Sequence, residues 1–201
     1  SAYFDGVSSY LQLPARYLPN ELTITLWFHP DSTANDWQPL ISLYQNYAQT
    51  GVPYRIVLTQ NGGTSNYIFN TQNANSQTTS SSGNPRTTVF SIVFSSWNFF
   101  AISIDASGNW RCVFPDGTSQ LLPAHRAIYD DIFYEDIFVG TNPTSSGFYQ
   151  GYISNLKIHD RALTFGEMQE IRRATNPGSP QPCLASPVAS AERFSQSLAG
   201  A

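Results

Sequence analysis

Aromatic, amide and charged side chains gather between residues 35 and 55. Such side chains can hold a sugar, because an aromatic face packs on the C–H surface of a pyranose ring while planar polar groups hydrogen-bond its hydroxyls. For any single ring the alternative is burial at the edge of a core, but Tyr47 lies in a polar stretch without strand periodicity. The candidate ligand-binding residues are therefore Asn35, Asp36, Trp37, Tyr44, Tyr47, Tyr54 and Arg55.

Side chains that could catalyse a reaction are not grouped in such a pattern. The histidines His29, His125 and His159 have no Gly-x-Ser-x-Gly elbow or cysteine near them that would provide a nucleophile. The acidic cluster at 130–136 lacks the alternation that aims two carboxylates into one cleft, which glycoside hydrolysis requires. We interpret this cluster as a solvated loop and expect that the protein is not an enzyme.

The two cysteines, Cys112 and Cys183, fit no zinc pattern. One interpretation is a disulfide between them, which would close a loop of roughly 70 residues and stabilise the fold by about 4 kcal/mol in the chain-entropy model. Such a bridge would also imply an oxidising compartment. The alternative is two unpaired thiols, one of them buried.

The composition excludes several classes of protein. Charged residues make up 12% of the 201 residues and the net charge is −4, so there is no basic stripe that could bind nucleic acid. The sequence contains no run of 18 apolar residues, so it predicts no membrane span. Serine, threonine, asparagine and glutamine supply most of the polarity, which suits a secreted, extracellular or surface-displayed protein. The chain begins directly before a strand pattern, as expected of a processed secreted protein or of a trimmed chain.

The elements that must position these residues are mainly strands. Leu22, Ile24, Leu26 and Phe28 alternate with polar and aromatic residues at period two, and Pro30 ends the run. The polar segment 71–87 and the segment 124–135, which is rich in aromatic and acidic residues, are expected to be loops. Strands are expected at 3–6, 10–13, 22–28, 39–44, 54–59, 66–70, 89–94, 97–105, 110–114, 136–140 and 148–158. This pattern predicts one all-β sandwich of two antiparallel sheets.

The strand at 148–158 and the segment after it carry two local signals. Ile153, Leu156 and Ile158 cannot share one face of a regular strand, so we expect a bulge near residues 154 and 155. Thr164 and Glu167 have the spacing of a capping box. A single short helix is therefore predicted at 164–174.

The chain is expected to divide into a sandwich, residues 1–175, and a C-terminal tail, residues 176–201. Residues 177–187 are proline-rich and expected to be extended, while Phe194 and Leu198 could share one face of a short helix. We expect the tail to dock on its own sandwich or on a neighbouring molecule. Docking on a neighbour would make the protein part of a homo- or hetero-oligomer.

Four segments together resemble the LamG-like jelly-roll domains of the concanavalin A-like lectin/glucanase superfamily. They are Phe4-Asp5-Gly6 with Tyr10 to Pro14, Leu22 to Phe28 with Pro30, Trp97 to Ala101 running to Asp116-Gly117, and Gly147 to Ile171. The resemblance implies a jelly-roll sandwich with six or seven strands in each sheet. It also implies that ligand loops lie at one rim.

The resemblance further implies one structural Ca²⁺ ion, for which Asp5 is the residue in the family's motif position. Asn142 and Asp116 are loop candidates for the same metal, without a motif behind them. The alternative for Asp5 and Asp116 is that each forms a turn before a glycine. Ser154 and Asn155 stand where many relatives have acids, and the Glu-x-Asp-x-Glu strand of the related glycosidases is missing.

The sequence therefore favours a non-catalytic recognition module that binds a glycan or another protein. Carbohydrate binding or adhesion is the leading hypothesis. The alternative is a structural subunit of a larger extracellular or virion-like assembly, in which the tail makes the contacts.

Overall fold

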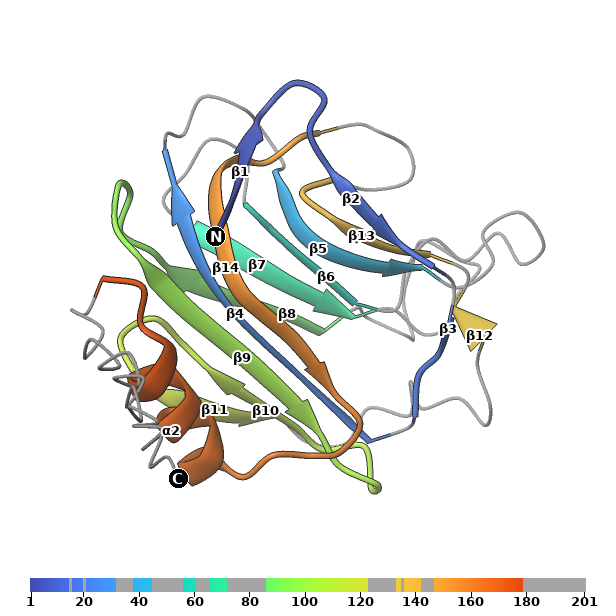
Figure 1. Cartoon of the computed structure of the whole chain (residues 1–201). Helices are drawn as coiled ribbons and strands as arrows, with labels where there is room; N and C mark the ends of the chain where they lie inside the picture. The colour runs from blue at the N-terminus through green and yellow to red at the C-terminus, as the bar shows by residue number, and fades with distance from the viewer. Residues whose placement is uncertain are drawn as a thin grey trace, which may run out of the picture.

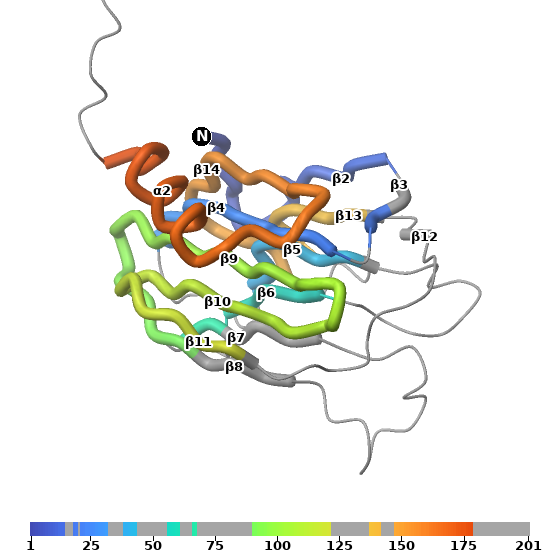
Figure 2. The backbone as a smooth tube through the Cα atoms, turned by 90° about the horizontal axis from the view of Figure 1, so that it is seen from below, coloured from blue at the N-terminus to red at the C-terminus, as the bar shows by residue number. Residues whose placement is uncertain are grey.

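Two antiparallel sheets packed face to face form the body of the protein (Figures 1 and 2), as the strand pattern predicts. The structure is a computed structural model that describes residues 1–14, 16–19, 21–31, 38–44, 56–60, 66–71, 86–122, 133–134, 136–141 and 147–178. The predicted tail from residue 179 onward lies outside these residues.

Sheet A contains six strands in the order β1–β14–β4–β9–β10–β11. Their bounds are β1 Ala2–Asp5, β14 Gln150–His159, β4 Leu22–Pro30, β9 Asn98–Ile104, β10 Trp110–Val113 and β11 Ser119–Leu122. Sheet B also contains six strands, in the order β2–β13–β5–β6–β7–β8. Their bounds are β2 Leu11–Leu13, β13 Asp136–Val139, β5 Pro39–Tyr44, β6 Ile56–Gln60, β7 Asn66–Thr71 and β8 Arg86–Ser91.

The remaining described elements are small. β3 (Arg16–Tyr17) and β12 (Phe133–Tyr134) form a separate two-stranded sheet. Helix α2 (Phe165–Thr175) lies on the outer face of sheet A, as Figure 2 shows from below.

Strand β4 is buried on both faces, although its sequence alternates. Leu22, Ile24, Leu26 and Phe28 point into the core between the sheets. On the opposite face Trp27 packs with residues of α2 and is only 5% exposed. The alternation therefore marks two different buried environments instead of a buried face and a wet one.

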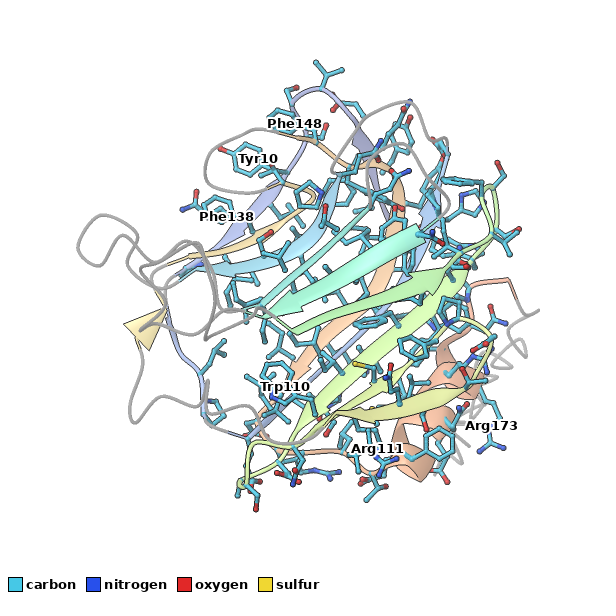
Figure 3. The ribbon with its side chains drawn as sticks, turned by 180° about the vertical axis from the view of Figure 1, so that it is seen from behind. Tyr10, Trp110, Arg111, Phe138, Phe148 and Arg173 are labelled. Carbon is cyan, nitrogen blue, oxygen red and sulfur yellow. The ribbon has the colours of Figure 1, made fainter. Side chains whose placement is uncertain are left out.

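The core between the sheets is rich in large rings. Trp110, Tyr67, Tyr149, Phe28 and Phe100 are each less than 2% exposed. Figure 3 shows Trp110 directed between the sheets from the end of β10. Burial on this scale stabilises the sandwich by roughly 1.5–3 kcal/mol for each side chain.

The predicted bulge in β14 is confirmed. The pairing of β14 with β4 shifts register between Ser154 and Lys157, and Asn155 has a positive φ of 51°. The extra residue turns Ile153, Leu156 and Ile158 to the same side, where all three pack on the core.

The predicted capping box is also confirmed, and it starts α2. The Thr164 side chain accepts a hydrogen bond from the Glu167 backbone N–H, and the Glu167 carboxylate accepts one from the Thr164 N–H. Arg161 adds an ion pair of 2.6 Å to the same carboxylate. Met168 then anchors the helix in a second apolar cluster with Trp27, Phe99, Val113 and Leu163.

Some strand boundaries differ from the prediction. β8 starts at Arg86, inside the polar segment expected to be a loop, because its backbone pairs with β7 from Thr71 to Asn66. β11 pairs with β10 as the second strand of a hairpin, and the sequence pattern did not predict this strand. β3 and β12 were not predicted either. In each case backbone pairing with another strand, adjacent in the chain for β11 and distant for β3 and β12, makes a strand from residues that lack an apolar alternation.

Candidate functional site

The predicted ligand residues are mostly not placed by the structure. Asn35, Asp36, Trp37, Tyr47, Tyr54 and Arg55 lie outside the described residues. Tyr44 is the last residue of β5, and its backbone pairs with Asp136. The segment before β5 and the segment after it leave from opposite ends of a six-residue strand, which spans roughly 17–20 Å. Whether residues 35–55 form one surface therefore stays a prediction.

Asp5, the predicted Ca²⁺ ligand, is occupied as a turn cap. Its Oδ1 accepts hydrogen bonds from the backbone N–H groups of Val7, Ser8 and Ser9, each at 2.9 Å. These hydrogen bonds hold the pKa of the exposed carboxyl well below its usual range. The second oxygen, Oδ2, has only the Ser8 hydroxyl at 3.4 Å, so Asp5 forms the turn that was the alternative interpretation, and its role as a Ca²⁺ ligand stays a prediction.

Asp116 has a similar role in the turn between β10 and β11. Its Oδ1 accepts from the Thr118 hydroxyl at 2.7 Å and from the Thr118 N–H at 2.8 Å. These bonds, with a smaller contribution from Arg172, lower the pKa of Asp116. Asn142 lies outside the described residues. No group of three or more acidic, histidine or cysteine side chains that could hold a metal is found in the described part of the chain.

Cys112 is a fully buried free thiol. It lies on the inner face of β10, and burial raises its pKa to about 12. The structure therefore does not support the predicted disulfide to Cys183, because the thiol of Cys112 packs among core side chains. Cys183 itself lies outside the described residues.

The structure instead reveals a groove where the connection between β8 and β9 meets the turn between β10 and β11. Its volume is about 630 Å³. The floor is apolar and well packed, since the ring of Phe90 stacks on Phe100 at 5.0 Å and contacts Phe114 at 5.4 Å. The lining residues are Phe90, Ser91, Ile92, Val93, Ser96, Trp97, Asn98, Phe114, Pro115 and Asp116.

A buried asparagine shapes the wall that carries Trp97. The Asn98 amide donates to the carbonyls of Val93 and Ser96 at 2.8 and 2.7 Å, and its Oδ1 accepts from the Val93 N–H at 3.0 Å. Ser95 also donates its backbone N–H to the Pro30 carbonyl. These bonds hold the connection in one conformation, so Trp97 has a defined position beside the groove.

Helix α2 holds the opposite wall of the groove. The Arg172 guanidinium donates to the Pro115 carbonyl at 2.7 Å, and the Gln169 amide donates to the Gly117 carbonyl at 2.8 Å. Gly117 has φ of +87°, and a Cβ there would collide with Arg172. The turn that carries Asp116 is thus fixed from behind by the helix.

Trp97 also ends a row of rings on the outer face of sheet A, which we call the outer strip. The outer strip consists of Tyr3 on β1, Tyr152 on β14, His29 on β4, and Trp97 directly before β9. Consecutive ring centroids are 4.9 Å (Tyr3–Tyr152), 6.0 Å (Tyr152–His29) and 5.5 Å (His29–Trp97) apart. Tyr3 is 50% exposed and Tyr152 is 40% exposed.

Two other surface groups are less complete. Tyr10, Phe138 and Phe148 approach one another at the far edge of sheet B, as Figure 3 shows, with ring centroids 6.4 Å (Tyr10–Phe138) and 6.5 Å (Tyr10–Phe148) apart. Arg111 and Arg173 lie near α2 in the same view, where Glu170 and Glu167 are also exposed.

The groove combines an indole ring, an apolar floor, two serine hydroxyls and one carboxylate. This mixture is typical of small-ligand sites, which are mostly apolar with a few polar groups that set orientation. The sequence names Trp97 and Asp116 as parts of a family-like segment but indicates no binding role for Trp97. An aromatic residue directly before the strand, followed by an asparagine, is the signal that could have suggested one.

Comparison with known proteins agrees with the two-sheet sandwich fold. A family model of the concanavalin A-like lectin/glucanases superfamily matches residues 5–169. No curated protein sequence matches the chain significantly. None of the described helices is long and apolar enough to cross a membrane.

Solved structures of the same jelly-roll fold are similar to the chain at low identity. A native heptameric SAP-like pentraxin from Limulus polyphemus has a TM-score of 0.60 and 13% identity, over 84% of this chain and 79% of that chain. The CBM40 of the Ruminococcus gnavus IT-sialidase, bound to alpha2,3 sialyllactose, has a TM-score of 0.59 and 12% identity, over 80% and 97%. Domains LG4-5 of the mouse laminin alpha1 chain have a TM-score of 0.56 and 18% identity, over 81% and 43%.

Proposed function

The chain belongs to the concanavalin A-like lectin/glucanases superfamily, and on this premise we propose that it is a non-catalytic module that binds glycans in the groove beside Trp97. The observation that carries the proposal is the groove itself, which is lined by an indole ring and apolar side chains together with hydroxyl and carboxylate groups. Similar solved structures include a carbohydrate-binding module with a bound sugar, which supports the ligand class.

The charge of the groove favours a neutral glycan. Asp116 supplies the charge among its lining residues, and the lowered pKa of that group keeps it ionised at physiological pH. A carboxylate beside the groove accepts hydrogen bonds from sugar hydroxyls but repels an acidic sugar. Arg172 does not line the groove, because its guanidinium is directed to the Pro115 carbonyl behind the turn.

The same residues favour binding over hydrolysis. Glycoside hydrolysis needs two carboxyl groups that flank the scissile bond, one of them protonated as the acid. The groove lining supplies one carboxyl group, and its pKa is lowered instead of raised. An extracellular or surface-displayed location agrees with this role and with the low charge content of 12%.

Calorimetry and glycan arrays with the full chain test the proposal. We expect a neutral oligosaccharide to bind, and Trp97→Ala to weaken binding about thirtyfold, equivalent to about 2 kcal/mol for one buried ring. Phe165→Ala, which removes an exposed ring on α2 away from the groove, is the matched control and should bind normally. Including EDTA in one arm tests whether Ca²⁺ is needed.

Two results would contradict the glycan proposal. One is the lack of binding to any neutral glycan with or without EDTA. The other is equal affinity of the wild type and Trp97→Ala. Preferential binding of sialylated glycans would overturn the assignment to neutral sugars.

A role as a subunit of a larger assembly is the second candidate. It is favoured by exposed apolar side chains close together in the N-terminal segment, where Val7 is 73% exposed and Tyr10 and Leu11 are 48% and 50% exposed. Contiguous apolar surface of this kind is common at protein interfaces. Light scattering that shows a monomer at all concentrations would count against this role.

A further inference from the structure

The outer strip is an aromatic surface on sheet A, on which Tyr3 and Tyr152 are exposed. Its rings are tilted against one another by 52° to 85°, so they form a ridged surface instead of a flat platform for a planar sugar chain. Proline-rich segments in the polyproline II conformation typically bind between aromatic side chains that are not coplanar, as in aromatic-lined grooves. The question is which segment could occupy it.

We propose that the outer strip is the docking surface of this chain's own proline-rich segment, residues 179–187. This inference does not depend on the proposed glycan binding. It selects one of the two alternatives that the sequence leaves open for the tail, which are docking on the same sandwich and docking on a neighbour.

The described part of the chain ends next to the outer strip. The C-terminal turn of α2 is tied to sheet A, because Trp27 donates its Nε1–H to the Thr175 hydroxyl at 3.0 Å and Asn155 donates to the Thr175 carbonyl at 2.8 Å. Gly178 then lies against the indole of Trp97, with 3.6 Å between the position of a Cβ on Gly178 and Trp97 Cδ1. The next residue therefore starts at one end of the outer strip.

The length and the composition of the segment after Gly178 also match the outer strip. The strip has three steps of 4.9 to 6.0 Å between ring centroids, so roughly five residues of polyproline II at about 3.1 Å each would cross it. Residues 179–183 read Ser-Pro-Gln-Pro-Cys, which places Pro180 and Pro182 within that length. Proline loses little conformational entropy on binding, and its ring packs well on aromatic faces.

The covalent connection of the segment to Gly178 also favours docking on the same molecule. A segment that starts beside its own docking surface has an effective concentration in the millimolar range, so weak contacts are sufficient to hold it there. A neighbouring molecule would need higher affinity to compete at ordinary protein concentrations.

Hydroxyl-radical footprinting of the full chain tests the proposal with an internal control. Tyr3 in the strip and Tyr10 outside it are almost equally exposed, at 50% and 48%. We expect Tyr3 to be oxidised about threefold more slowly than Tyr10, as when the tether keeps about two thirds of the molecules closed. Equal rates for the two tyrosines would overturn the proposal.

A pair of tail variants identifies the segment responsible. Replacing Pro180 and Pro182 by serine should raise the oxidation of Tyr3 to the rate of Tyr10, whereas Val188→Ser, just beyond the segment, should leave it low. Circular dichroism checks that both variants are folded. If protection of Tyr3 persists in the double variant, or increases with protein concentration, the occupant is not segment 179–187 of the same chain.

Intact mass under non-reducing conditions gives an independent check. Cys112 faces the interior of the sandwich, on the side of sheet A opposite the outer strip, so a Cys112–Cys183 disulfide and the proposed docking exclude each other. We expect two free thiols, with Cys183 reacting quickly and Cys112 reacting only after denaturation. A native disulfide would overturn the proposal.

Discussion

Two neighbouring rows of aromatic side chains lie on the outer face of sheet A. The side chains of one row are buried, whereas those of the other are partly exposed. Trp27 and Phe99 form one row with ring centroids 5.2 Å apart, and both are almost completely buried under α2. The adjacent row is the outer strip, in which Tyr3 and Tyr152 are half exposed. Trp27 and His29, two residues apart on β4, thus belong to a small core and to an open surface.

The difference between the rows comes from one helix. Helix α2 is 11 residues long, and Met168 places it over Trp27 and Phe99 but not over His29. An aromatic residue on the face of a sheet is therefore structural or available for binding according to what packs on it, and the strand pattern is the same in both cases.

The largest effect on stability is expected when the helix side chain that covers Trp27 and Phe99 is truncated. Met168→Ala removes a fully buried side chain and should lower the free energy of unfolding by about 2–5 kcal/mol. Tyr152→Ala in the outer strip should change it by no more than about 1 kcal/mol. Chemical denaturation measures both, and similar losses for the two variants would show that the strip is also core.

The next effect concerns the wall that carries Trp97. Asn98→Ala leaves buried backbone groups of the β8–β9 connection without partners, which should cost about 1–3 kcal/mol. It should also abolish the proposed glycan binding, because Trp97 loses its fixed position. A variant that is less stable but binds normally would show that the position of Trp97 does not matter for binding.

A smaller effect is expected at the start of the helix. Thr164→Ala removes the N-cap hydroxyl of α2 and should cost about 1 kcal/mol. Because the helix covers only one row, Trp27 fluorescence should respond more than the oxidation of Tyr3. Thr164→Ser keeps the hydroxyl and serves as the control, and it should behave as the wild type does.

The smallest effect is a pH dependence from the same capping box. The hydrogen bonds from Arg161 and then Thr164 lower the pKa of Glu167 to about 2, from an ordinary value of 4.5. A lowered pKa stabilises the folded state above the ordinary value, and this contribution is lost as the pH falls towards 2. The stability difference between wild type and Glu167→Gln should therefore shrink from pH 6 to pH 2, measured by thermal unfolding. A constant difference would contradict this account.

The fold was largely predictable, but the candidate site was not. Alternation in β4, the odd step between Ile153 and Leu156, and the Thr164–Glu167 spacing each predicted the structure that forms, because each is a local constraint. The groove instead joins residues of β8, β9 and the β10–β11 turn, which meet only after the sheets have formed. The candidates at 35–55 were chosen for composition, and a described strand separates their two parts.

The sequence alone determined the two-sheet sandwich, the bulge in β14 and the capped helix, since periodicity and capping act between residues close in the chain. Only the tertiary structure decided that Asp5 caps a turn, that Cys112 is a buried thiol, and that Trp97 is partly exposed beside a groove while Trp27 is covered. The physical reason is that the exposure of a side chain on sheet A depends on the long-range packing of α2. Trp27 and His29 lie on the same face of β4, and nothing in the local sequence indicates which of them the helix will cover.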